Sequence, residues 1–284
     1  MSYRKGNRIV GYTPSFFPFQ ALFQLVMLPI RLINWLFYRT RVKGRENLRR
    51  CGSAILVSNH TMLMDPAVVA YALGFRRTYF TMLEETALIP YLGTFVRLLG
   101  ALPIPEGSGS LISLENAART ALSQLGLLHF FPEGECYRWS QDIQPFRPGA
   151  FLLACRLGIP VIPMTTVLHE RRWRGRTSVR VLGRTVPVAP VVTVIIGRPV
   201  APLAAQWSPA AGGSHPSAAA GQPDLHALRG AALKMSAQVR ELMQQTIDRL
   251  GGSREIYRGK MPRLVKKPRA LESEAVGQRR AQAM

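Results

Sequence analysis

The sequence has few cysteines, and their spacing argues against two kinds of site. Cys51, Cys136 and Cys155 are the only three in 284 residues, and no two of them form a C-x-x-C pair. An odd number without paired spacing indicates a reducing compartment rather than a disulfide-stabilised secreted domain. No Cys/His cluster has the spacing of zinc ligands, so the sequence predicts no metal site and no bound cofactor.

Acidic residues are also scarce. The chain has 37 Lys and Arg against 16 Asp and Glu, which gives a formal net charge of +21. Such a field favours an anionic partner: nucleic acid, an anionic membrane surface or a phosphate-bearing substrate. Nucleic acid is disfavoured because the basic residues are not interleaved with stacking aromatics, and no nucleic-acid-binding module is recognisable. We therefore expect no nucleic-acid partner.

The sequence lacks an uninterrupted apolar run of about 18 residues, the minimum for a transmembrane helix. Its most apolar zone, residues 16–38, is broken by Pro29 and Arg31, and no small-residue cleavage site follows it, which argues against a signal peptide. Trp35 lies near the end of the zone, and four basic residues follow within residues 39–45.

That combination of an apolar helix, aromatic residues and a basic flank is typical of a segment lying in a membrane interface. The sequence therefore predicts a membrane-interface helical segment over residues 1–43 and a peripheral or monotopic protein on an anionic membrane surface. A helix packed on the domain and a kinked membrane span are the alternatives.

Buried strands and helices alternate through the middle of the chain. Strands are expected at residues 54–58, 78–82, 101–104, 127–131, 161–164 and 191–196, and helices at residues 67–73, 89–99, 110–125 and 149–157. The alternation predicts an α/β domain over residues 44–203, with a mixed, largely parallel sheet flanked by helices.

The C-terminal part has a different composition. Residues 204–224 are rich in Ala, Gly, Pro and Ser and predict a flexible loop, and residues 225–250 form an amphipathic helical pattern. Residues 251–284 contain nine Lys/Arg without apolar periodicity, which predicts a basic, disordered tail. Six arginines within residues 170–184 indicate either a solvated loop or a patch that faces lipid or phosphate.

A histidine and an aspartate follow the first buried strand. His60 and Asp65 are five positions apart, directly after the apolar run 54–58. At a strand-to-helix junction this spacing allows both side chains to face one cleft. A carboxylate bonded to one ring nitrogen fixes the tautomer and leaves the other nitrogen free as a base. From these two residues alone, a histidine that caps the next helix, with the aspartate on its first turn, is the favoured interpretation.

A second candidate cluster follows a later strand. Phe131, Pro132, Glu133 and Gly134 come directly after the apolar residues that end at Phe130. Proline and glycine on either side of a carboxylate at a strand end hold it rigidly toward the cleft above the sheet, where α/β folds place their ligands. By itself this tetrapeptide is common, and a simple turn is the favoured interpretation.

Together these stretches resemble the glycerolipid acyltransferase family of the PlsC, or lysophosphatidic-acid acyltransferase, type. The family's first motif, N-H-x4-D, is complete as Asn59, His60 and Asp65, and its third motif, F-P-E-G, is complete at residues 131–134. The stretch I-P-V-I-P at residues 159–163 matches the fourth motif. The two complete motifs, in this order, make the resemblance specific.

The resemblance implies a reaction and a set of roles. His60 would act as general base on an acceptor hydroxyl, and Asp65 would orient its ring. The hydroxyl would attack the thioester of acyl-CoA or acyl-carrier protein directly, so no Ser or Cys nucleophile is needed, and the sequence has no G-x-S-x-G elbow. The acceptor would be a lyso-lipid such as 1-acylglycerol-3-phosphate, at the cytoplasmic face of the cell membrane. Substrate-binding residues would be Asn59, Phe131, Pro132, Glu133 and Gly134.

The chain departs from the family pattern at two arginines. After F-P-E-G the family usually continues with Thr/Ser and Arg, whereas this chain has Glu135 and Cys136, and the second motif ends in Glu106 instead of arginine. The family associates those arginines with the acceptor phosphate. Arg138 and Arg147 are the candidates to replace them, because a guanidinium pairs bidentately with phosphate. A non-phosphate lipid acceptor, or a catalytically inactive membrane-bound scaffold, is the alternative.

Overall fold

The structure is a computed structural model that describes residues 16–49, 51–74, 76, 78–87, 89–104, 110–202 and 225–262. The predicted flexible loop at 204–224, most of the predicted tail and Glu106 therefore lie outside the described residues.

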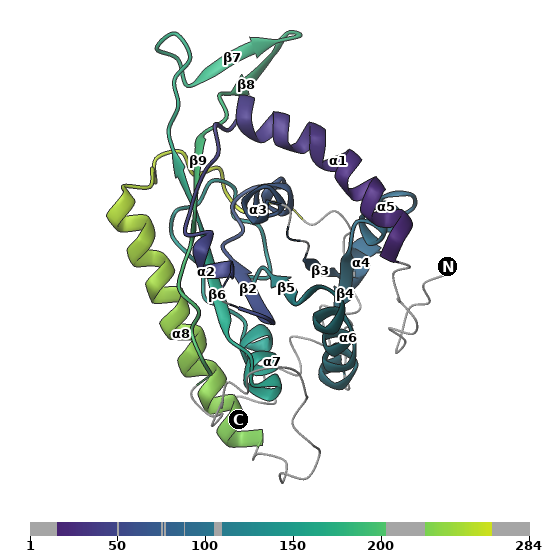
Figure 1. Cartoon of the computed structure of the whole chain (residues 1–284). Helices are drawn as coiled ribbons and strands as arrows, with labels where there is room; N and C mark the ends of the chain where they lie inside the picture. The colour runs from purple at the N-terminus through teal and green to yellow at the C-terminus, as the bar shows by residue number, and fades with distance from the viewer. Residues whose placement is uncertain are drawn as a thin grey trace, which may run out of the picture.

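A seven-stranded sheet forms the centre of the molecule (Figure 1). Its strands are β1 (Arg41–Lys43), β2 (Ala54–Ser58), β3 (Tyr79–Leu83), β4 (Ala101–Ile104), β5 (Leu127–Phe130), β6 (Val161–His169) and β9 (Val191–Ile196). Their order is β1-β9-β6-β2-β5-β3-β4. β2 pairs in parallel with β5 and β6, and only the β6–β9 pair within this sheet is antiparallel among the described residues. The predicted α/β class with a mixed, mostly parallel sheet is confirmed.

Helices cover both faces of the sheet. One face carries α6 (Ser110–Leu125), α7 (Gly149–Leu157) and α8 (Leu225–Leu250), and the other carries α2 (Glu46–Arg49) and α3 (Asp65–Leu73). The short helices α4 (Glu84–Ala87) and α5 (Leu92–Leu98) connect β3 to β4. Alternation along β2 explains the two layers, since Ile55 joins the core under α6–α8 and Leu56 joins the core under α3. Strands buried on both faces read as the continuous apolar runs seen in the sequence.

Helix α1 (Phe16–Leu36) lies across α3 on the outside of the molecule (Figure 1). Met27 on its inner side packs against Ala70 of α3. Its other side exposes large apolar residues, namely Leu25, Leu28, Leu32, Trp35 and Leu36. Within the described part of the chain, no helix combines the length and the apolar character that a membrane crossing requires.

Two predictions need correction. Residues 178–187, predicted as part of an irregular arginine-rich stretch, contain an antiparallel hairpin of β7 (Ser178–Val181) and β8 (Arg184–Pro187). The predicted disordered tail starts at residue 251, whereas residues 251–262 pack onto the domain: Ile256 is buried, and Met261 N donates to Cys136 O at 2.8 Å. One buried isoleucine in a polar stretch gives no periodic signal, which is why the sequence did not predict this packing.

Candidate active site

The register of two neighbouring strands brings the two sequence motifs together. Val57 of β2 pairs with Phe130 of β5 in a parallel ladder. Continuing three residues beyond each of these positions places His60 beside Glu133 at the same edge of the sheet. A hydrogen bond joins them, from His60 N to Glu133 Oε1 at 2.8 Å. The site therefore lies at the carboxyl ends of the parallel strands, where open α/β sheets bind their ligands.

His60 and Asp65 form the expected pair. The Nδ1 atom of His60 lies 2.8 Å from Oδ2 of Asp65. The same carboxylate oxygen accepts the backbone N–H groups of Thr61 at 2.5 Å and Met62 at 2.7 Å, and Asp65 is buried. These bonds fix the carboxylate, and the carboxylate fixes the imidazole, so Nε2 is the nitrogen left for chemistry. The capping interpretation of His60 is not what the structure has, because Met64 occupies the N-cap of α3.

Two further contacts hold His60, one at its ring and one at its main chain. The ring of Phe131 stacks on it with centroids 4.2 Å apart and planes inclined by 22°. The His60 carbonyl accepts the backbone N–H of Tyr137 at 2.9 Å. The side chain is 22% exposed, so a substrate can reach a ring that is otherwise fixed by its neighbours.

The electrostatics of His60 favour a strong base. Burial lowers the pKa of His60, but the hydrogen bond to Asp65 and the neighbouring Cys136 thiol outweigh burial and raise that pKa to about 10. The contact with Cys136 had no sequence signal beyond its position three residues after Glu133. A high pKa makes Nε2 a good proton acceptor once it is deprotonated, and it stabilises the imidazolium that forms during proton transfer.

Glu133 connects the two loops of the site. Its Oε1 accepts the N–H of His60 and its Oε2 accepts the N–H of Gln144 at 3.1 Å. Burial raises the pKa of Glu133 to about 7, and the two backbone N–H groups limit the rise. Because both oxygens bind main chain and the residue is buried, Glu133 positions the loop that carries His60.

Asn59, expected to contact substrate, is used inside the fold. Its Nδ2 donates to Thr166 O at 2.9 Å, and its Oδ1 accepts Thr166 N at 2.8 Å. Only 1% of the residue is exposed, so no surface of Asn59 faces a ligand. The amide joins the end of β2 to β6 and thereby fixes the start of the loop that carries His60.

Of the two candidate arginines, Arg147 lies against the F-P-E-G turn. Its backbone N–H donates to Pro132 O at 2.8 Å. Gly134 has φ of +70°, and a Cβ at this position would lie 2.5 Å from Arg147 Nε, so glycine allows the guanidinium to lie over the turn. Arg138 pairs through its backbone with Gly259 and is exposed.

A second histidine lies beneath the site. Nε2 of His129, on β5, is 2.8 Å from Ser58 Oγ, and its ring contacts those of Phe80 and Phe131. Complete burial lowers the pKa of His129 to about 3, so this imidazole is neutral. It supports Phe131, which in turn supports His60. No sequence pattern distinguishes His129 from its apolar neighbours on the strand.

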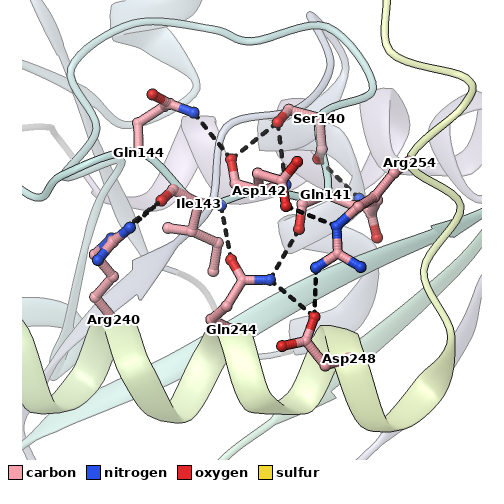
Figure 2. Close-up of polar contacts among 9 residues, drawn as sticks. All are labelled: Ser140, Gln141, Asp142, Ile143, Gln144, Arg240, Gln244, Asp248 and Arg254. Atoms are coloured by element: carbon pink, nitrogen blue, oxygen red, sulfur yellow. Dashed lines mark hydrogen bonds and ion pairs between the residues drawn. The ribbon is translucent and has the colours of Figure 1, made fainter.

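Helix α8 holds the loop that follows the site, as Figure 2 shows. Gln244 accepts the N–H of Ile143 at 2.9 Å and donates to Gln141 O at 3.1 Å, and Arg240 donates twice to Ile143 O. Gln144, the next residue, donates its N–H to Glu133. The helix is thus linked to the His60 loop through a continuous series of hydrogen bonds. Residues some hundred positions apart make these contacts, so no local sequence pattern announces them.

The described residues contain no group of three or more His, Cys, Asp or Glu side chains that could hold a metal ion.

Comparisons with known proteins agree with this geometry. The model of the family described as Acyltransferase matches residues 39–167. A chloroplast 1-acyl-sn-glycerol-3-phosphate acyltransferase of Brassica napus is 28% identical over 133 residues, which are 45% of this chain and 37% of that protein. An uncharacterized protein of Mycobacterium tuberculosis is 25% identical over 280 residues, which are 89% of this chain and 74% of that protein. The match thus spans little more than a third of the plant protein's length.

A solved structure shares the fold. The crystal structure of the 1-acyl-sn-glycerophosphate (LPA) acyltransferase PlsC from Thermotoga maritima superposes with a TM-score of 0.52, over 82% of this chain and 83% of that chain, at 20% sequence identity. The matched family region contains both strands of the site, the His60–Asp65 pair and the F-P-E-G turn. The part of the chain that carries this site, residues 39–167, therefore matches the acyltransferase family.

Proposed function

We propose that this protein is an O-acyltransferase of membrane lipid synthesis. It moves a fatty acyl group from acyl-CoA or acyl-carrier protein to a hydroxyl of a lysophospholipid-like acceptor, 1-acylglycerol-3-phosphate or a related lyso-lipid. The observation that carries the proposal is the His60–Asp65 pair, in which Nδ1 is bonded to a buried carboxylate and Nε2 is left for the acceptor.

The reaction needs one proton relay and no covalent enzyme intermediate. His60 Nε2 takes the proton of the acceptor hydroxyl while its oxygen attacks the thioester carbonyl carbon. The tetrahedral intermediate collapses, the carbon–sulfur bond of the donor breaks, and the leaving thiolate takes the proton from His60. The products are an ester and a free thiol. General-base assistance of this kind contributes about 10²–10⁴-fold to the rate.

Asp65 has two tasks in this scheme. It keeps the proton of neutral His60 on Nδ1, which directs the lone pair of Nε2 toward the acceptor. It also stabilises the imidazolium after proton transfer, because its negative charge is 2.8 Å from Nδ1. The N–H groups of Thr61 and Met62 hold the carboxylate in place during both steps.

Arg147 supports a phosphate-bearing acceptor. Its guanidinium lies over Gly134, next to the turn that positions His60, and it is exposed. A guanidinium at this position can pair bidentately with a phosphate of the acceptor. Arg147 would then replace the arginine that the family pattern has at Cys136.

A phosphate-free lipid acceptor is a second candidate. It is favoured by the two side chains that follow F-P-E-G. Cys136, at the position of the missing arginine, is a thiol beside His60, and Glu135 is an acid paired with Lys260 at 3.5 Å. Neither side chain attracts a phosphate. The geometry of His60 and Asp65 is the same for both acceptors, so the two candidates share one mechanism.

The acceptor is identified by assaying the purified chain with a labelled acyl thioester. Acceptors are presented in matched pairs, 1-acylglycerol-3-phosphate against the corresponding phosphate-free monoacylglycerol. If the acceptor carries a phosphate, 1-acylglycerol-3-phosphate is acylated. In Arg147→Gln the KM for this acceptor should then rise about tenfold or more, as expected when a charged hydrogen bond is lost. Preference for the second acceptor would support the phosphate-free candidate. No ester product from either acceptor with CoA or carrier-protein donors would contradict the proposed function.

The site of action in this proposal is the cytoplasmic face of the cell membrane. The exposed apolar side of α1 and the net charge of +21 support attachment to an anionic bilayer. A lyso-lipid acceptor resides in that bilayer, so attachment brings His60 to its substrate.

A further inference from the structure

The β7–β8 hairpin is a separate structural unit that projects from the body of the domain (Figure 1). β7 and β8 form a two-stranded sheet of their own, and within the described residues no other strand pairs with them. Two-stranded hairpins are marginally stable in water without packing partners. A projecting hairpin of this kind is therefore a candidate interaction surface.

The tip of the hairpin has an unusual residue. Leu182 and Gly183 are the two turn residues between β7 and β8, and both have positive φ, +48° and +77°. Turns of this type favour Asn, Asp or Gly, and a leucine in the left-handed region is strained. Leu182 is also 99% exposed. The turn conformation and the exposure in water both disfavour leucine here, so this residue is explained best by an apolar medium around the tip.

Apolar residues continue from the tip along one face of the hairpin. Val179 and Val186 are directly opposite each other, and Val181 is two residues further along the same strand, on the same face. Val181 is 49% exposed and Val186 is 43% exposed. The tip and this face form a mainly apolar surface, which we call the hairpin face: Val179, Val181, Leu182 and Val186. Arg184 lies on the same face, directly opposite Val181.

Arginines surround the hairpin face. Residues 170–187 contain six arginines and one glutamate, and Arg172 pairs with that glutamate, Glu170, at 3.0 Å. Arg180 and Arg184 lie on the strands themselves, and Arg174 lies in the turn near the half-exposed Trp173. An apolar tip with a surrounding set of arginines and an interfacial tryptophan matches the layered chemistry of an anionic bilayer, which has phosphates outside and acyl chains inside.

The hairpin is attached to the exposed end of α1. Nη1 of Arg171 donates to the carbonyl of Phe37 at 2.9 Å, directly after the helix. Trp35, Leu36 and Phe37 at that end are each more than half exposed. The hairpin therefore lies next to the exposed apolar end of α1.

We propose that the β7–β8 hairpin docks the protein on an anionic lipid bilayer, with Leu182 and its neighbours entering the acyl-chain layer and the surrounding arginines binding lipid phosphates. This contact is additional to α1 and independent of the acyl-transfer chemistry. Its role is to fix the orientation of the domain on the membrane, because α1 alone leaves the domain free to rotate about the helix axis.

The test is a vesicle sedimentation assay with the full chain and no donor or acceptor. Vesicles are phosphatidylcholine alone, or equal parts of phosphatidylcholine and phosphatidylglycerol. Leu182→Asn removes the apolar tip while it suits the turn, so the hairpin still folds. Leu233→Asn is the matched control. Leu233 is 57% exposed on α8, which covers the face of the sheet opposite to the one that carries α3. The paired variant Arg180→Gln, Arg184→Gln is compared with Arg229→Gln, Arg249→Gln on α8.

The proposal predicts tighter binding to the anionic vesicles. Leu182→Asn is expected to weaken that binding about tenfold or more. The Arg180/Arg184 pair is expected to weaken it roughly thirtyfold, at about fivefold for each arginine. Both control variants should bind like the wild type.

Two results would overturn the proposal. One is equal binding to neutral and anionic vesicles, and the other is a Leu182→Asn variant that binds like Leu233→Asn. If the arginine pair alone weakens binding, the protein adsorbs to the lipid surface by charge and the hairpin does not insert. A protein that binds vesicles in this way and transfers no acyl group would contradict the proposed function alone.

Discussion

The imidazole of His60 is held by chemically different neighbours on its edge and its face. Asp65 binds its Nδ1 edge with a charge, and Phe131 covers its face with a ring. The charge sets the pKa of His60, and the stacked ring limits its rotation. Catalysis by a general base requires both, because the nitrogen must be basic and must also point at the acceptor.

Removing the charge while keeping the shape separates these effects. In Asp65→Asn, the pKa of His60 falls from its raised value of about 10, because the hydrogen bond loses its anionic partner. The base works in its deprotonated form, so the rising limb of kcat/KM with pH moves to lower pH, while the plateau falls about 10²-fold or more. The measurement is the full pH–rate profile. A limb at the wild-type position would show that Asp65 does not set the basicity of the catalytic group.

At the scale of elements, strand register accounts for much of the site and loop packing for the rest. The alternation of strands and helices predicted the α/β sheet, and residues 101–104, 110–125, 149–157, 191–196 and 225–250 are elements with the predicted bounds. These elements were predictable because apolar periodicity and flanking glycines mark them locally. The pairing of His60 with Glu133 depends on β2 lying beside β5, which the sequence indicates only through the family resemblance.

What the sequence could not predict depends on long-range contacts. The hydrogen bond between Gln244 on α8 and the main chain of Ile143 joins residues about a hundred positions apart, and Asn59 bonds to Thr166 across a similar separation. Polar side chains that bind distant main chain look the same in the sequence as polar side chains that bind substrate. Asn59 was therefore expected at the ligand, although its amide serves the sheet.

Substitution of Gln244 tests whether the hydrogen bonds from α8 to this loop support the site. In Gln244→Ala the N–H of Ile143 loses its acceptor, and the loop that holds Glu133 loosens. We expect kcat to fall several-fold while the free energy of unfolding falls by about 1–3 kcal/mol, because the main-chain groups of Ile143 and Gln141 both lose their partner. Gln245→Ala is the matched control, since Gln245 bonds only to the exposed Glu241 in the described structure. Equal kcat values for the two variants would mean that α8 has no influence on the site.

At the scale of the whole molecule, the chain after α8 returns to the active-site loop. Arg138 N donates to Gly259 O at 3.0 Å, Met261 N donates to Cys136 O, and Arg258 lies over the ring of Trp139. These residues cover the segment that follows Glu133. The end of the domain therefore supports the same loop that α8 supports from the other side.

Truncation of the chain tests whether the contacts made by residues 251–262 support the site. A chain ending at residue 250 loses the buried Ile256 and the backbone bonds to residues 136–138, so we expect a lower melting temperature and at least a tenfold lower kcat/KM. A chain ending at residue 262 keeps these contacts and serves as the control. The readouts are thermal unfolding and acyl transfer. Full activity of the shorter chain would show that residues 251–262 do not support the site.

The central claim is that His60 transfers the acceptor proton and that acyl transfer is direct. Its most direct test is the rate of ester formation from a labelled acyl thioester in His60→Ala, with Cys136→Ala as the matched control from the same site. We predict that His60→Ala lowers kcat about 10²–10⁴-fold in a protein that still folds, with a lower melting temperature because the buried Asp65 loses its partner. Cys136→Ala should retain activity within about tenfold, and no acyl group should be found on the protein. Retained activity in His60→Ala, or an acyl thioester on Cys136 together with an inactive Cys136→Ala, would contradict the account.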